Sequence, residues 1–215
     1  TATDDKRPQF QAMIDAALLP VLRRVTEGPA RRLRARGVTA DQVTLAGFAL
    51  GVAAAGALAM GWFAAGLALI VLNRVADGLD GAVARASGPT DRGAFLDIAA
   101  DFLFYALVPL GFALADPAAN ALPAAALIAS FVGTGSSFLA FASIAARRGL
   151  TADRYPKKGI YYLGGLSEGA ETIAVFLAMC LWPAYFPWLA WTFAAACVLT
   201  TGLRWRMGWT SFGPE

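Results

Sequence analysis

Four aspartates within a stretch of 25 residues form two closely spaced pairs, Asp77 with Asp80 and Asp97 with Asp101. Carboxylate oxygens are the ligands that Mg²⁺, Mn²⁺ and Ca²⁺ prefer in proteins. The first pair is three residues apart and the second pair four, so on helices each pair shares one face. If the two helices pack together, the four acids converge. The spacing therefore predicts a divalent-metal site formed by two helices.

The composition of the chain is typical of a membrane protein. It is 58% hydrophobic and 15% charged, whereas soluble domains are about 25% charged. An ionised aspartate at the centre of a bilayer costs at least ~2.5 kcal/mol, so four of them need compensation. Arg85 and Arg92 are too few to neutralise all four, so the alternative to a metal is that the acids pair with arginines or line a polar seam. The paired spacing, with small residues between the acids, favours the metal.

The elements that must position these acids are membrane-spanning helices. Such a helix needs about 20 mostly apolar residues. Six segments qualify, at 43–60, 62–84, 94–115, 120–146, 159–182 and 186–203. We therefore expect an all-α integral membrane protein with six transmembrane helices. The expected division is an N-terminal segment over 1–42 and a membrane domain over 43–215.

The basic residues predict the orientation in the membrane. Residues 9–36 are partly apolar and partly basic, which is typical of an amphipathic helix at the interface. Its arginines either bind anionic lipids or only set the topology. All 18 lysines and arginines can be assigned to one side of the membrane. The positive-inside rule then places both termini and the acidic site in the cytoplasm.

The residues around the acids resemble the signature of the CDP-alcohol phosphotransferases, D-x2-D-G-x2-A-R, a spacer, then G-x3-D-x3-D. The matching residues are Asp77, Asp80, Gly81, Ala84, Arg85, Gly93, Asp97 and Asp101. The spacer, 86–92, has seven residues where eight is common. The six-span layout extends the resemblance over most of the chain, and points to a bacterial subgroup of unassigned acceptor.

The resemblance implies a reaction and a role for each matching residue. Family members transfer a substituted phosphate group from a CDP-alcohol to a second alcohol and release CMP. Most use CDP-diacylglycerol and make phospholipids. The implied ligands of two Mg²⁺ or Mn²⁺ ions are Asp77, Asp80, Asp97 and Asp101, of which Asp101 would also be the general base. The implied CDP contacts are Gly81, Ala84 and Arg85. A homodimer in the bacterial inner membrane is also implied, with membrane lipids but no nucleic acid as partners.

The chemistry of such a transfer suits these residue types. A pyrophosphate is negatively charged, and divalent cations stabilise the charge that develops on its leaving group. A carboxylate within hydrogen-bond reach can take the proton of the attacking hydroxyl, and an arginine suits a phosphate fork. A lipid donor would explain why the enzyme lies in the membrane.

The start of the first span adds one candidate. Thr39 and Gln42 have the spacing of a capping box. The family that this chain resembles usually has Pro-Asn where this chain has Ala40 and Asp41. A threonine that matches Thr44 follows in that family pattern. Thr44 therefore either contacts the CDP part or only flanks the start of the helix.

A second group of charged residues could bind the acceptor. Glu168 and Glu171 lie three apart in an apolar span, near the basic residues Arg147 and Lys158. The carboxylates would bind hydroxyls or an amine, and the basic residues a phosphate. The alternative is that the glutamates pair with Lys157, Lys158 or Arg74 and hold the helices together. The sequence does not name the acceptor.

Two other functions remain open at this stage. One is transfer from another CDP-alcohol to a lipid alcohol. The other is a carboxylate-lined cation carrier, which typically places its acids at the midplane and has inverted repeats. This chain shows no repeat, and it has no histidine, so histidine-based acid–base chemistry is excluded.

Overall fold

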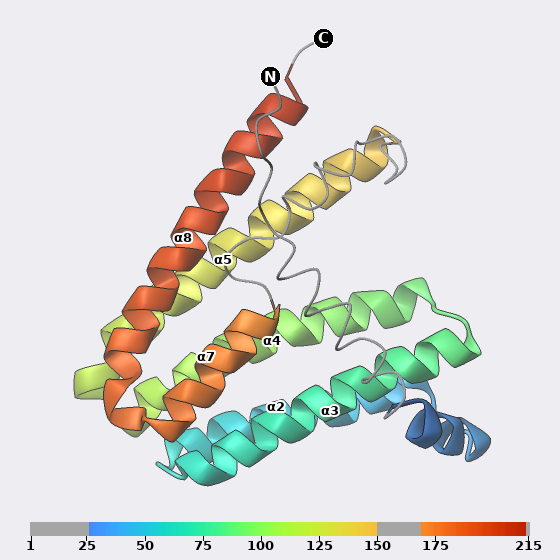
Figure 1. Cartoon of the computed structure of the whole chain (residues 1–215), viewed down its shortest axis with the longest axis horizontal. Coiled ribbons are helices and arrows are strands. Elements are labelled where there is room, and N and C mark those ends of the chain that lie inside the picture. The colour runs from blue at the N-terminus through green and yellow to red at the C-terminus, as the bar shows by residue number, and fades with distance from the viewer. Residues whose placement is uncertain (1–25, 150–168, 214–215) are drawn as a thin grey trace, which may run out of the picture. The chain divides into compact units, whose positions relative to one another are not determined.

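The computed structural model describes residues 26–149 and 169–213, and within these ranges it contains helices but no β-strand. The elements are α2 (Ala40–Ala59), α3 (Phe63–Ser87), α4 (Asp91–Ala115), α5 (Pro117–Arg147), α7 (Gly169–Leu181), η1 (Pro183–Tyr185) and α8 (Phe186–Ser211). A further helix covers 26–35. Figure 1 shows their order along the chain. The all-α class expected from the sequence is confirmed.

Each of the six predicted spans overlaps one of the helices. Four segments are long and apolar enough to cross a membrane: α2, α4, α5, and η1 with α8. α3 carries the acidic motif, and the described part of α7 has only 13 residues. Six spans therefore stay a prediction. So do the interfacial location of 9–36, of which 9–25 lies outside the described residues, and the division at residue 42.

The helix starts and ends follow from local sequence. Thr39 N donates to Gln42 Oε1 (3.0 Å) and Gln42 N to Thr39 Oγ1 (3.3 Å), which confirms the predicted capping box at the start of α2. Asp116 Oδ1 accepts from Ala119 N (3.1 Å) at the start of α5. After α3, Gly88 has a φ of 91°. That left-handed conformation favours glycine and allows a short turn into α4.

The described residues divide into two compact units. The first consists of 26–49 and 72–100, and the second of 50–71, 101–149 and 169–213. In the first unit, Ala30 of the 26–35 helix packs against Ala82 and Val83 of α3. α2 and α3 approach closely in the same unit, because Asn73 Nδ2 donates to Gly47 O (2.8 Å) and Gly47 has no side chain to intervene.

The second unit has an aromatic core. The ring of Phe112 stacks on Phe63, with ring centroids 5.5 Å apart, and on Phe186, at 4.5 Å. Both Phe112 and Phe186 are fully buried. α5 and α8 lie side by side (Figure 1), and Arg204 Nη1 donates to Thr134 O (3.0 Å) between them. Among the described residues, the larger of the two buried hydrophobic clusters therefore contains none of the motif acids.

Gly111→Ala is expected to destabilise the second unit. A Cβ at this position would lie 2.7 Å from Ala55 O and 2.9 Å from Leu58 Cβ. Because backbone must move to admit it, we expect a loss of about 1–3 kcal/mol, as for overpacked cores. The measurement is thermal unfolding in detergent. Gly56→Ala is the matched control, because nothing lies within 4 Å of its added Cβ. Equal melting temperatures for the two variants would contradict the packing argument.

Candidate active site

Asp80 is the most enclosed of the motif acids on α3. It is 6% exposed, and its Oδ2 accepts a hydrogen bond of 2.6 Å from Thr44 Oγ1 on α2. The same hydroxyl lies 3.1 Å from Ala40 O, one turn earlier on its own helix. The shorter distance and the charged acceptor assign the hydroxyl hydrogen to Asp80. The structure therefore places the Thr44 hydroxyl beside Asp80, and a contact of Thr44 with CDP stays a prediction.

The acids of α3 and α4 meet in the first unit. Asp77 and Asp97 each offer a carboxylate oxygen, and these atoms lie within 4.8 Å of one another. Asp101 follows Asp97 by one turn of α4, so the two share a face of that helix. Asp77 Oδ1 also lies 3.8 Å from Arg74 Nη1. This ion pair is of the kind expected if the acids pair with arginines and hold no metal. The seven-residue spacer does not separate the acidic helices.

This donor set fits a divalent cation. Mg²⁺ and Mn²⁺ favour carboxylate oxygens, and two carboxylate oxygens at most 4.8 Å apart are close enough to share an ion or to bridge a pair. The burial of Asp80 also suits a nearby cation, because a buried carboxylate is stabilised by a compensating charge or by hydrogen bonds.

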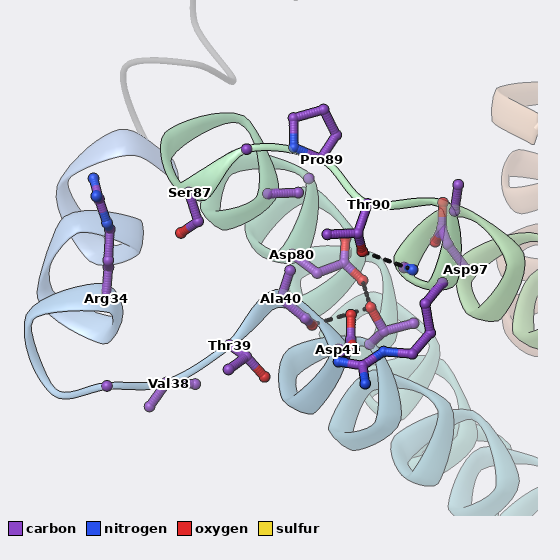
Figure 2. Close-up of a pocket in the computed structure, with 18 residues that line it drawn as sticks. Arg34, Val38, Thr39, Ala40, Asp41, Asp80, Ser87, Pro89, Thr90 and Asp97 are labelled. Carbon is purple, nitrogen blue, oxygen red and sulfur yellow. Dashed lines mark hydrogen bonds and ion pairs between the residues drawn. The ribbon is translucent and has the colours of Figure 1, made fainter.

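A cavity of about 550 Å³ opens within the first unit beside Asp80 and Asp97, whereas Asp77 and Asp101 are not among the residues that line it. Figure 2 shows Asp80 and Asp97 on its walls, the start of α2 along one side, and the loop through Ser87, Pro89 and Thr90 along another. Motif residues on its wall, besides these two acids, are Gly81, Ala84 and Gly93, and Thr44 lines it as well. A volume of this size falls in the range of sites for small ligands.

Arg85 is placed differently from the other motif residues. Its exposed side chain lines a separate hollow of about 350 Å³, together with Glu27 and Arg31 of the 26–35 helix. It still lies close to the cavity wall, because its Nη1 is 3.2 Å from the position that a Cβ on Gly81 would take. A contact of Arg85 with a nucleotide stays a prediction.

Two residues that sequence reasoning did not assign to the site also line the cavity. Asp41 Oδ2 and Arg92 Nη2 form an ion pair of 2.5 Å between the first turns of α2 and α4. The available signal was weak: Asp41 stands where the resemblance usually has asparagine. Arg92 lies within the spacer, for which the motif specifies no residue types.

The predicted acceptor residues are only partly described. Glu171 is half-buried in the first turn of α7, and Arg147 is exposed at the end of α5. Glu168 and Lys158 lie outside the described residues. An acceptor site formed by these four residues stays a prediction.

The sequence profile of CDP-alcohol phosphatidyltransferases matches residues 37–203, which include all of the motif acids. The chain belongs to the CDP-alcohol phosphatidyltransferase family. It is therefore a transferase enzyme of phospholipid biosynthesis, and the carrier interpretation is set aside.

Two curated proteins are similar to this phosphatidyltransferase in sequence. One is the inner membrane protein YnjF of Escherichia coli (strain K12), 52% identical over 192 residues that cover 89% of this chain and 93% of the relative. The other is the archaetidylinositol phosphate synthase of Methanothermobacter thermautotrophicus, 32% identical over 164 residues, or 74% of this chain and 73% of the relative.

Solved structures of a Mycobacterium tuberculosis enzyme, phosphatidylinositol phosphate synthase PgsA1, are similar to this phosphatidyltransferase in fold. The structure with CDP-DAG bound has a TM-score of 0.65 at 28% identity and covers 87% of this chain and 94% of its own. The complex with manganese and citrate has a TM-score of 0.66 at 28% identity, with 86% and 89% covered.

Proposed function

We propose that this phosphatidyltransferase transfers the phosphatidyl group of CDP-diacylglycerol to a small alcohol and releases CMP. The observation that carries the proposal is the cavity of about 550 Å³, because Asp80, Gly81, Ala84 and Asp97 of the motif line it together. The relative solved with CDP-DAG bound supports the lipid donor over a water-soluble one. This favours a phospholipid product over transfer from another CDP-alcohol to a lipid alcohol.

The acids would hold Mg²⁺ or Mn²⁺, as a pair of ions, through Asp77, Asp80, Asp97 and Asp101. The proximity of the Asp77 and Asp97 carboxylates supports this, as does the manganese complex of the mycobacterial relative. When bound, the cations supply charge stabilisation for the pyrophosphate and its CMP leaving group.

The remaining residues of the cavity would bind and orient the donor. Gly81 and Ala84 line the cavity and leave room on α3 for the nucleotide, since glycine has no side chain and alanine only a methyl group. Thr44 holds the Asp80 carboxylate in one orientation through its 2.6 Å hydrogen bond. Asp101 would accept the proton of the attacking hydroxyl as general base, which places that hydroxyl at the α4 face of the site.

The acceptor is the part of the reaction that relatives inform most directly. Two relatives are named as synthases of inositol phosphate lipids: an archaetidylinositol phosphate synthase and a phosphatidylinositol phosphate synthase. Inositol phosphate is therefore the first acceptor to test. Arg147 and Lys158 would bind its phosphate, and Glu168 and Glu171 its hydroxyls.

The location of the enzyme follows from the same relatives and from its charges. Similarity to an inner membrane protein supports a multi-pass protein of the bacterial inner membrane. The distribution of lysine and arginine supports cytoplasmic termini and a cytoplasmic active site. A homodimer remains part of the proposal.

The test is CMP release by the purified full chain in lipid nanodiscs. CDP-diacylglycerol is offered with serine, glycerol, glycerol phosphate, inositol or inositol phosphate, with Mn²⁺ or Mg²⁺ and with chelator as control. A parallel reaction offers a water-soluble CDP-alcohol with diacylglycerol. We expect CMP only with the lipid donor, a cation and one acceptor. Turnover of the water-soluble donor alone, or turnover unaffected by chelator, would contradict the proposal.

A further inference from the structure

Asp41 connects the first turn of α2 with the first turn of α4. One carboxylate oxygen, Oδ2, pairs with Arg92 Nη2 at 2.5 Å. The other, Oδ1, lies 3.2 Å from the position that a Cβ on Gly93 would take. The side chain of Asp41 is 19% exposed. The carboxylate is thus enclosed against α4 and not directed into solvent.

Gly93 leaves the space that the Asp41 carboxylate occupies against α4. An added Cβ would meet Asp41 Oδ1 at 3.2 Å and Thr90 Oγ1 at 3.1 Å, and both distances are tighter than ordinary packing. Thr90 Oγ1 already accepts the hydrogen bond of Gly93 N (3.1 Å), so the threonine is held in place. The close contact with α2 therefore explains why position 93 of this chain is a glycine.

The contact with Gly93 matters more than the ion pair. The side chain of Arg92 is 83% exposed, and ion pairs to such exposed cations contribute little to stability. The carboxylate beside the first turn of α4 is enclosed, and it lies at the end of the helix where backbone N–H groups favour an oxygen. Close contact with α4 is thus the larger part of the interaction.

α2 contacts both helices that carry the acids. Three residues after Asp41, Thr44 donates its hydrogen bond to Asp80 on α3. On α4, Asp97 follows Gly93 by one turn, so it moves with the part of α4 that Asp41 contacts. The first turns of α2 therefore fix the position of α4 relative to α3 in the region where the carboxylates of Asp77 and Asp97 lie close together.

We propose that Asp41 is a positioning residue that keeps Asp97 against the acids of α3, and so sets the affinity of the site for divalent cations. The proposal rests on the proposed function, since it assumes that these acids hold a cation. A lost contact would let the start of α4 move away from α2. The site would then bind cations more weakly, while the ligands themselves remained intact.

The test measures Mn²⁺ binding directly, by the electron paramagnetic resonance signal of free Mn²⁺ in titrations of the purified full chain. Asp41→Ala is expected to raise the Mn²⁺ dissociation constant about 10-fold, at the lower end of the range for residues that orient metal ligands. Asp41→Asn is expected to stay within about 3-fold of wild type, because the amide fills the same space and its oxygen still accepts from Arg92. Arg92→Ala is expected to have an equally small effect.

The matched control is Asp91→Ala, which removes the same charge from the first turn of α4, the helix that Asp41 contacts. Asp91 is exposed and does not line the cavity, so its variant is expected to bind Mn²⁺ as wild type does. Gly93→Ala is the second test, since it displaces the carboxylate while leaving its charge, and is expected to weaken Mn²⁺ binding as Asp41→Ala does. If Asp41→Ala fails to fold, Gly93→Ala still tests whether this contact affects Mn²⁺ binding.

The possible outcomes separate this inference from the proposed function. If wild type binds Mn²⁺ and Asp41→Ala binds it equally well, the positioning role is wrong. If Asp41→Asn loses as much affinity as Asp41→Ala, negative charge and not position is the cause, and the inference is overturned. If wild type itself neither binds Mn²⁺ nor releases CMP, the proposed function fails first.

Discussion

Asp101→Asn is expected to stop phosphatidyl transfer while most of the divalent-cation binding remains. An amide has nearly the size of the carboxylate and keeps one oxygen that can bind a cation. It cannot take the proton of the attacking hydroxyl. Since general bases contribute about 10²- to 10⁴-fold to rate, we expect kcat for CMP release to fall by that factor. The measurements are initial rates at saturating Mn²⁺ and a Mn²⁺ titration of the same preparation.

Asp91→Asn is the matched control for this prediction. It makes the same substitution on the same helix, α4, at an exposed residue outside the cavity. Its rate is expected to equal that of wild type. Full activity of Asp101→Asn would remove Asp101 as the base. Loss of Mn²⁺ binding together with activity would instead make it chiefly a metal ligand.

Asp80→Asn is expected to weaken cation binding strongly and to abolish transfer. Its carboxylate is buried at 6% exposure and accepts the 2.6 Å hydrogen bond of Thr44. Asparagine still offers an oxygen to that hydroxyl, so the packing is preserved and the main change is the lost charge. Residues that merely orient ligands change metal affinity about 10- to 100-fold. We therefore expect at least a ~100-fold weaker Mn²⁺ affinity, measured by titration, and no detectable CMP.

Thr44→Val separates the charge of Asp80 from its orientation. The substitution removes the hydrogen bond and leaves the carboxylate, so an intermediate loss of Mn²⁺ affinity is expected, smaller than that of Asp80→Asn. If Asp80→Asn kept near wild-type affinity, Asp80 would be a structural acid of the α2–α3 contact. That result would favour the interpretation in which the acids serve helix packing.

Local sequence was sufficient to predict the helices and the faces they share. The lengths of the apolar runs predicted six helical segments. These segments overlap α2, α3, α4, α5, α7 and α8. The capping box of Thr39 and Gln42 was predicted because its two hydrogen bonds join residues three apart. The pairing of acids along α3 and along α4 follows from the helical period alone. Each of these features depends only on neighbours in the chain.

The partners of the site residues were decided by tertiary structure. Thr44 had two open interpretations, and only the packing of α2 on α3 brought its hydroxyl to Asp80, 36 residues away. Asp41 contacts Gly93 and Arg92, and Arg85 lines the same hollow as Arg31, because of how each helix is rotated about its axis. A sequence period defines which residues share a face. The close packing of side chains between helices determines which neighbour that face meets.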